Sequence, residues 1–113
     1  MATQSGPRMT LPTQLVLRAL LADPTREKYG LQICSEAGLP SGTIHPILAR
    51  FENLGWLEST WEDDATARAD GRPARRYYHL TEDGAERARI ALAQATTSIS
   101  ALGLRPQPAA GAA

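Results

Sequence analysis

Apolar residues recur at helical spacing in three successive segments of the chain's first half. The first segment begins near Thr10 to Thr13, and Asp23-Pro24 should end it because proline cannot continue a helix. A short second helix is expected from about Tyr29 to Ala37, followed by Gly38 where a left-handed residue commonly ends a helix. The apolar face of the third segment consists of Ile44, Ile47, Leu48, Phe51 and Leu54. The pattern predicts three consecutive helices with a tight turn before the third.

Pro46 and Gly55 limit the third helix. Proline has no N–H to donate and is harmless only in the first helical turn, so we expect the helix cap between Ser41 and Thr43. Gly55 should end the helix. These limits define 41–54 as one element.

Two candidate strands follow the third helix, at residues 56–62 and 75–80. A polar loop that ends in Gly71-Arg72-Pro73 separates them. They predict a β-hairpin with one buried face, and its outer part, residues 61–80, is called the wing below.

The last segment has the clearest hydrophobic period in the chain. It opens with Thr81, whose hydroxyl can cap a helix, followed by acidic Glu82 and Asp83, which suit a helix N-terminus. Small and branched apolar residues then recur at alternating spacings of three and four, a heptad pattern typical of paired helices. The residues of this seam are Ala85, Ala88, Leu92, Ala95, Ile99 and Leu102. We predict that they form the interface of a homodimer.

The order of these elements predicts a mainly α-helical protein with a small β-hairpin, arranged as a winged helix-turn-helix. Residues 10–80 would form the DNA-binding domain and residues 81–102 a C-terminal dimerisation helix. Residues 1–9 and 103–113 are rich in Gly, Pro, Ala and Gln without a hydrophobic period, so we expect disordered tails there. A length of 113 residues leaves no room for a second, catalytic domain, and an enzyme is not expected.

Composition agrees with an ordinary globular protein, with 42% apolar and 21% charged residues. No apolar run approaches the roughly 18 residues needed to cross a bilayer, and the N-terminus lacks the apolar stretch of a signal peptide. We therefore expect a cytoplasmic protein without a membrane partner.

The single cysteine, Cys34, fits a reducing compartment, and it stands at no metal-ligand spacing with His45 or His79. Neither a metal nor a cofactor is expected.

The net charge of zero is the main argument against nucleic acid, because duplex binders usually carry a basic excess. The charge is unevenly distributed, however. Acidic residues gather over 58–64, whereas 68–76 holds four arginines against one aspartate. The net charge and its distribution are compatible with two functions. One is a sequence-specific DNA-binding regulator, and the other is a winged-helix protein-interaction module that does not bind DNA.

The third helix is the candidate DNA-reading element. If its apolar residues face the core, then Thr43, His45, Pro46, Ala49 and Arg50 lie on the opposite face or its flanks. Most of these side chains are small, so the helix can enter a major groove deeply. Arg50 suits guanine O6 and N7 or a phosphate, and free N–H groups near Ser41 and Thr43 suit a phosphate oxygen.

Three stretches of the chain together resemble the PadR family of bacterial winged-helix repressors. They are YGLQI, SGTIHPILARFENLGWLESTWE and GRPARRYYHLTEDG. The most specific part is the combination of residues 42–48 with 71–73 and 77–81, in this order and at this separation. The resemblance covers about residues 11–100.

This resemblance implies a repressor that binds an inverted repeat in double-stranded DNA as a homodimer. The C-terminal helix of each subunit would pack on its mate and on the partner's N-terminal helix. The resemblance implies DNA contacts through Thr43, His45 and Pro46 on the helix and Arg72 and Arg75 on the wing. Together with the residues argued from the pattern, the predicted DNA-binding set is Ser41, Thr43, His45, Pro46, Arg50, Arg72, Arg75 and Arg76. His45 stands where the family very often has tyrosine, and the acidic, alanine-rich stretch 63–70 resembles a lengthened wing. The C-terminal part resembles the shorter members with one dimerisation helix.

Trp61 and Tyr78 have two interpretations. Some members of the resembled family bind aromatic drugs or phenolic compounds, which implies an effector pocket that these two residues would line. Alternatively, Leu57, Trp61, Tyr78 and Leu80 fill the ordinary core beneath the hairpin. A small-molecule effector is therefore one candidate partner.

Overall fold

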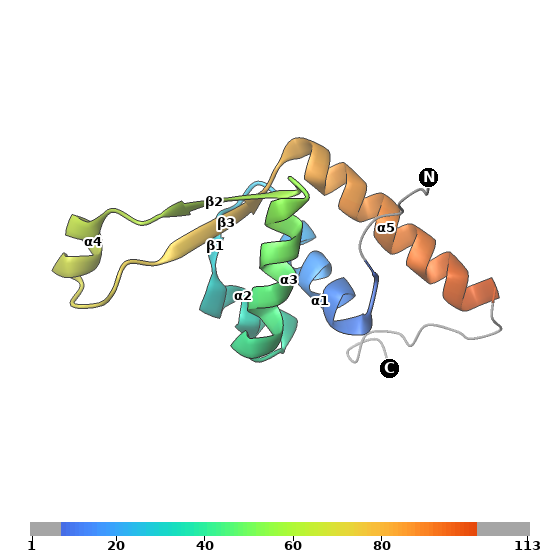
Figure 1. Ribbon diagram of the computed structural model, residues 1–113, viewed down its shortest axis with the longest axis horizontal. Coiled ribbons are helices and arrows are strands. Elements are labelled where there is room, and N and C mark those ends of the chain that lie inside the picture. The colour runs from blue at the N-terminus through green and yellow to red at the C-terminus, as the bar shows by residue number, and fades with distance from the viewer. Residues whose placement is uncertain (1–7, 102–113) are drawn as a thin grey trace.

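The computed structural model describes residues 8–101, with side chains for residues 8–95. Its elements are α1 Leu11–Leu21, β1 Lys28–Tyr29, α2 Gly30–Ala37, α3 Ser41–Asn53, β2 Leu57–Trp61, α4 Asp64–Ala69, β3 Arg76–Leu80 and α5 Glu82–Ala101. Helices α1 to α3 form a bundle, the strands extend from one side of it, and α5 extends from the other (Figure 1). The predicted mainly α-helical fold with a small sheet is confirmed.

The N-terminal boundary lies close to the expected one. Thr10 caps α1, and its side-chain oxygen accepts a hydrogen bond from the Thr13 N–H, as predicted. Met9 was expected in the tail, but it packs against the core, and its carbonyl accepts a 2.8 Å hydrogen bond from Gln14. The expected tail 103–113 and residues 1–7 of the expected tail 1–9 lie outside the described residues.

The helical bundle encloses the core, with Leu17, Ile33 and Phe51 completely buried. The predicted apolar face of α3 is confirmed for four of its residues, which are 0–5% exposed: Ile44, Ile47, Leu48 and Phe51. The prediction for Leu54 is wrong, because 48% of its surface is exposed. Leu54 is the cap after the last helical residue, and Gly55 then turns the chain with a left-handed φ of 81°.

The sheet has three antiparallel strands in the order β1-β3-β2, where only a two-stranded hairpin was predicted. Strand β1 comprises two residues, too few for any period, and pairs Lys28 with Tyr78. Lys28 is 3% exposed, and its Nζ donates 2.7 Å hydrogen bonds to the Ala19 carbonyl and to Glu36. These partners allow a lysine to occupy an interior position.

Helix α3 begins earlier than expected, at Ser41 with Pro40 as its cap. Pro46 therefore lies in the second turn, and the prediction that it occupies the first turn is wrong. A proline at this position leaves the Gly42 carbonyl without its helical donor. Both Gly42 and Pro46 are exposed, so water can hydrate that carbonyl and the helix continues.

The start of α5 is fixed against the end of the loop before β2. The Thr81 N–H donates to the Trp56 carbonyl at 2.9 Å, and the Thr81 hydroxyl accepts from the Gly84 N–H at 2.8 Å. A Cβ atom on Gly84 would lie only 2.1 Å from the Trp56 carbonyl oxygen. Only glycine allows this close approach of α5 to the loop.

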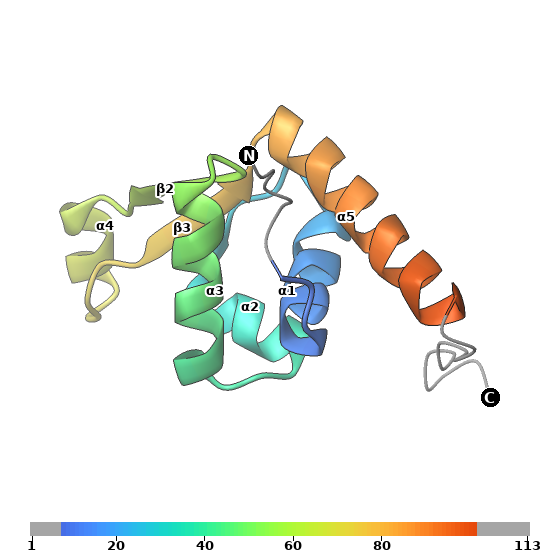
Figure 2. The ribbon, with the colours of Figure 1, turned by 45° about the vertical axis from the view of Figure 1, so that its right-hand side comes forward.

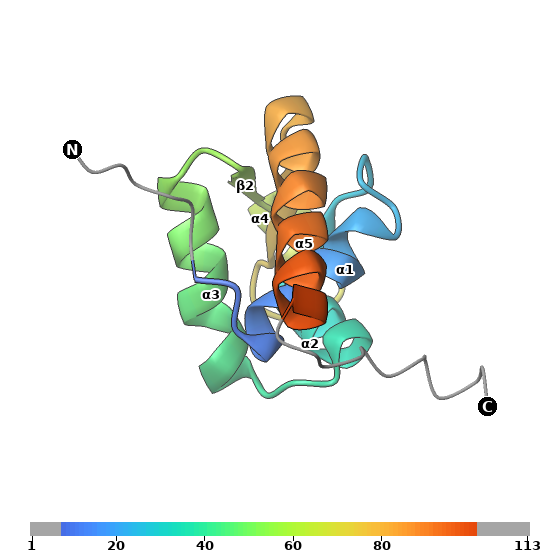
Figure 3. The same cartoon turned by 90° about the vertical axis from the view of Figure 1, so that its right-hand side faces the viewer.

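The seam of α5 divides into two parts. Ala85 and Ala88 are 7% and 0% exposed because they pack into the chain's own core, so they are already covered before any partner binds. Leu92 and Ala95 are half-buried, and the backbone of Ile99 continues the helix. Leu102 lies outside the described residues. Figure 2 shows that the later turns of α5 extend beyond the bundle, and in Figure 3 the same helix lies in front of the bundle, toward the viewer. Within residues 8–101, no helix is long and apolar enough to span a membrane.

Candidate nucleic-acid interface

Helix α3 presents one exposed face, as its apolar period predicted. Ser41, His45, Pro46, Ala49 and Arg50 are exposed on it, and Thr43 is half-buried. The Arg50 side chain has no ion pair or hydrogen bond with any described residue, so its charge is available to a ligand. The N–H groups of Ser41 and Gly42 precede the first N–H that donates within the helix, that of Thr43, and also have no partner within residues 8–101.

His45 packs across the first residue of α2. A Cβ atom added to Gly30 would lie 3.0 Å from Cε1 of His45, so the two helices are close at this point. Glycine at position 30 therefore leaves room for the imidazole ring on the exposed face of α3. The YG pair at 29–30 is part of the resemblance, and the helical period places Gly30 on the inward face of α2, but no sequence pattern indicated that it faces His45.

The wing contains a short helix, α4, where an extended polar loop was expected. Asp63 caps α4 by accepting a hydrogen bond from the Thr66 N–H at 3.2 Å, and Ala67 is only 2% exposed. Six residues are too few for a helical period to emerge from the sequence. One sequence signal does indicate this helix. Asp63 stands three residues before Thr66, the spacing of a helix cap, at the start of an alanine-rich segment.

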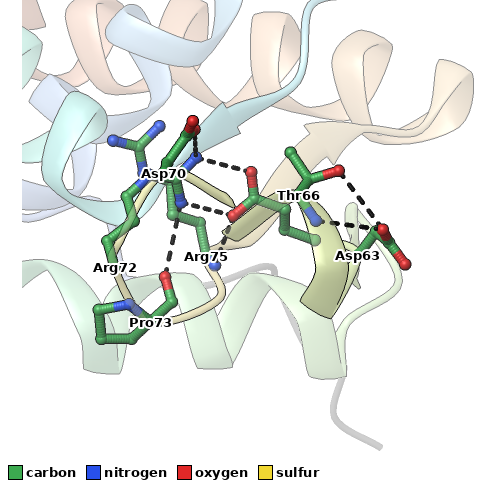
Figure 4. Close-up of polar contacts among 7 residues, drawn as sticks. Asp63, Thr66, Asp70, Arg72, Pro73 and Arg75 are labelled. Carbon is green, nitrogen blue, oxygen red and sulfur yellow. Dashed lines mark hydrogen bonds and ion pairs between the residues drawn. The ribbon is translucent and has the colours of Figure 1, made fainter. Parts of the chain in front are cut away.

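Arg72 holds the wing together. Its guanidinium forms a two-pronged ion pair with Glu62, with Nη2 and Oε2 2.8 Å apart, and a 3.1 Å contact with Asp70 (Figure 4). Glu62 also accepts a 3.2 Å hydrogen bond from the Arg75 backbone N–H. The hydrogen bonds from Arg72, with the smaller effect of the Arg75 N–H and both positive charges, lower the pKa of Glu62 to about 2. Two carboxylates thus neutralise an arginine that was predicted to contact DNA.

Arg76 connects the wing to α3. Its Nε donates to the Ser59 hydroxyl at 2.9 Å, and its Nη2 lies 3.0 Å from Glu52 on α3. The hydrogen bond from Ser59, followed by that from Arg76, lowers the pKa of Glu52. This arrangement fixes the base of the wing relative to the candidate reading helix.

Arg75 differs from the other two predicted wing arginines. Its guanidinium carbon lies 4.1 Å from the centroid of the Tyr29 ring, and Tyr29 in turn meets the edge of Tyr77. Among residues 8–95, no carboxylate pairs with this guanidinium. Arg75 is thus a positioned cation whose charge is not neutralised.

A cavity of about 330 Å³ lies between α2, α3 and the wing. Trp61 and Tyr78 line it, as predicted for an effector pocket, together with His45, Arg75 and Arg76. The walls that the sequence did not indicate are Tyr29, Gly30 and Leu31. The alternative interpretation, that Trp61 fills the core, is wrong because Trp61 is 65% exposed, whereas Leu57 and Leu80 are buried. Trp61 lies past the bundle, where β2 leaves the core.

Within the described part of the chain, no group of three or more His, Cys, Asp or Glu residues is arranged to hold a metal ion. The cavity's charged side chains are both arginines. The chemistry that the cavity offers is therefore the binding of an anionic partner.

Comparison with known structures gives the same fold. A PadR family transcription regulator from Clostridium difficile R20291 superposes with a TM-score of 0.62 at 21% identity, over 82% of this chain and 94% of that one. The regulator PcaV from Streptomyces coelicolor, solved with its natural ligand, gives 0.60 at 28% identity, over 89% of this chain and 64% of that one. For the transcriptional regulator PA4135 the values are 0.56 and 23%, over 76% of this chain but only 56% of that one.

Sequence comparison defines the family. No curated protein sequence gives a significant match. The family model described as the transcriptional regulator PadR-like family matches residues 17–90, which include α2, α3, the whole wing and the first half of α5. The matched proteins are transcriptional regulators and not enzymes, as predicted. The chain belongs to the PadR-like family of winged-helix transcriptional regulators.

Proposed function

We propose that this protein is a repressor that binds an inverted-repeat operator as a homodimer. The observation that carries the proposal is the exposed face of α3, which adjoins a positioned and unneutralised Arg75. With α3 in the major groove, Thr43, His45 and Arg50 would contact base edges, and the small side chains of Pro46 and Ala49 would permit close approach.

Backbone contacts are assigned to a smaller set than the sequence suggested. Arg75 and the exposed N–H groups at Ser41 and Gly42 would hold phosphates. Arg72 and Arg76 already pair with carboxylates, so their role in this proposal is to hold the wing in position for Arg75. In both arginines the ion pair already occupies guanidinium N–H groups that a phosphate would otherwise accept from.

The dimer would form through the outer half of α5. Leu92 and Ala95 are half-buried and Ile90 is 50% exposed, so apolar surface remains for a partner helix. Ile99 and Leu102 would continue this interface, whereas Ala85 and Ala88 contribute by holding α5 against its own subunit. Two subunits joined in this way would present their α3 helices to successive major grooves about one helical turn apart.

The test is binding of the purified protein to the duplex upstream of its own gene and to a random duplex, by fluorescence anisotropy at two salt concentrations. We expect binding to the upstream duplex to exceed binding to the random duplex by about a thousandfold or more. Repression follows if the same protein blocks transcription from that promoter.

A protein-interaction module is the second candidate, and the net charge of zero favours it. Absence of binding to either duplex at low salt would favour this candidate and refute the repressor. A small effector would bind in the cavity lined by Trp61 and Tyr78, so its role depends on whether an aromatic compound or another partner binds there.

A further inference from the structure

Two large apolar side chains are exposed at the cavity between α2, α3 and the wing. Leu31, in the first turn of α2, is 72% exposed, and Trp61, at the end of β2, is 65% exposed. Single exposed apolar residues are ordinary on protein surfaces. Leu31 and Trp61, however, come from different elements and line the same cavity, which indicates a surface that a partner covers.

The charges at this cavity limit the chemistry of its occupant. Arg75, whose charge is not neutralised, lines it together with Arg76, which pairs with Glu52 outside the cavity, and no carboxylate lines it. The Arg75 guanidinium lies over Tyr29, and the Arg76 guanidinium lies 5.5 Å from the centroid of the Trp61 ring. The occupant therefore combines an anionic group with an apolar face.

We propose that the cavity receives one sugar-phosphate unit of the DNA backbone, with Trp61 and Leu31 covering the deoxyribose and Arg75 holding the phosphate. This inference rests on the proposed function. His45 belongs both to the cavity and to the exposed face of α3, so a duplex that receives α3 in its major groove brings a flanking strand over the cavity. The volume of 330 Å³ equals about eleven water molecules at about 30 Å³ each, which is room for a sugar ring with its phosphate.

In this proposal Trp61 contacts the DNA backbone directly, although it is neither an arginine nor a residue of the exposed face of α3. Sugar and phosphate are common to every nucleotide, so the contact adds affinity without base preference. It also releases no counterion, because the indole carries no charge. These two properties separate Trp61 from Arg75 in experiment.

The first test compares Trp61→Ala and Trp61→Phe with wild type on a random-sequence duplex over a series of salt concentrations. Trp61→Ala should weaken binding roughly tenfold, the effect of uncovering about 60 Å² of apolar surface, while the salt slope stays unchanged. Trp61→Phe should retain most of the affinity. Leu54→Ala removes another exposed apolar side chain, outside the cavity, and should bind as wild type.

The second test uses acrylamide quenching of tryptophan fluorescence, which reports mainly on Trp61 because Trp56 is only 7% exposed. Saturation with duplex should lower the quenching constant severalfold. If sodium benzoate shields Trp61 and the duplex does not, the cavity is a site for small aromatic anions and the inference is overturned.

The proposed function and the assignment of the cavity to the DNA backbone can each be refuted without the other. If wild type binds no duplex at low salt, the proposed function itself is refuted. If wild type binds and Trp61→Ala binds equally well, only the assignment of the cavity to the DNA backbone is refuted.

Discussion

Gly84 fixes how α5 leaves the winged domain, so its replacement by alanine should destabilise the whole subunit. The added Cβ would lie 2.1 Å from the Trp56 carbonyl oxygen and 2.6 Å from the Trp56 Cα, and both are backbone atoms that no rotamer change can move. Relief requires a shift of roughly 1 Å between α5 and the loop before β2, the kind of overpacking that typically destabilises by about 1–3 kcal/mol. The hydrogen bond from the Thr81 N–H to the same carbonyl would weaken as well.

Helix propensity acts in the opposite direction and provides the control. Alanine is about 1 kcal/mol better than glycine within a helix, so the observed loss at Gly84 is reduced by that amount. Gly42 is also helical, but a Cβ there would meet nothing within 4 Å. We therefore expect Gly42→Ala to stabilise by about 0.4–1 kcal/mol. A 2.1 Å clash with backbone atoms belongs at the upper end of the overpacking range, so we expect Gly84→Ala to destabilise by about 2 kcal/mol net.

Urea unfolding followed by circular dichroism measures both variants, at one fixed protein concentration because a dimer's stability depends on it. For a domain of this size, 1 kcal/mol corresponds to a change in Tm of about 4–8 °C. An unfolding midpoint for Gly84→Ala equal to or above that of wild type would refute the close approach of α5 to Trp56.

Three further predictions follow from the wing and the dimer helix. Arg75→Ala should reduce the salt slope of DNA binding by about 1 per subunit, whereas Arg72→Ala should leave the slope unchanged and loosen the wing, seen as faster amide exchange there. The pKa of Glu62 is lowered in the folded protein, so its contribution to wing stability is complete above pH 4.5 and is lost as the pH falls toward about 2. Wing amide signals measured by NMR should change over that interval, and Glu62→Gln should show the changed signals already at neutral pH. Leu92→Asp should give a monomer in light scattering, because it places a charge in the proposed interface, and Gln94→Asp, at an exposed position, should remain dimeric.

The helical period of the apolar residues was sufficient to predict the exposed face of α3. The spacing of apolar residues in α3 predicts which residues are buried, and the exposed remainder follows by geometry. The predictions for α3 were wrong at two positions, Pro46 and Leu54. Pro46 lies in the second turn and not the first, because an exposed proline is compatible with either, and Leu54 is exposed because it follows the last helical residue.

The roles of the wing arginines were beyond the reach of sequence patterns, because they depend on contacts between distant residues. Arg72 meets Glu62 ten positions away, and Arg76 meets Glu52 twenty-four positions away. The first contact depends on α4 folding the tip of the wing, and the second on the packing of β2 against α3. A count of arginines in 68–76 therefore overestimated the charge available to DNA.

This division of the arginines leads to a quantitative expectation for the intact protein. On a random duplex Arg50 lacks its base partner and would contact a phosphate, as Arg75 does, so a dimer neutralises four phosphates and the plot of log K against log salt should have a slope of about −4. If Arg72 and Arg76 also bound phosphates, the slope would be about −7. Anisotropy titrations of a random duplex at five salt concentrations distinguish the two values. A slope near −7 would mean that the ion pairs of Arg72 and Arg76 open on binding, and a slope near −4 would explain how a chain of zero net charge binds DNA through a few unneutralised arginines.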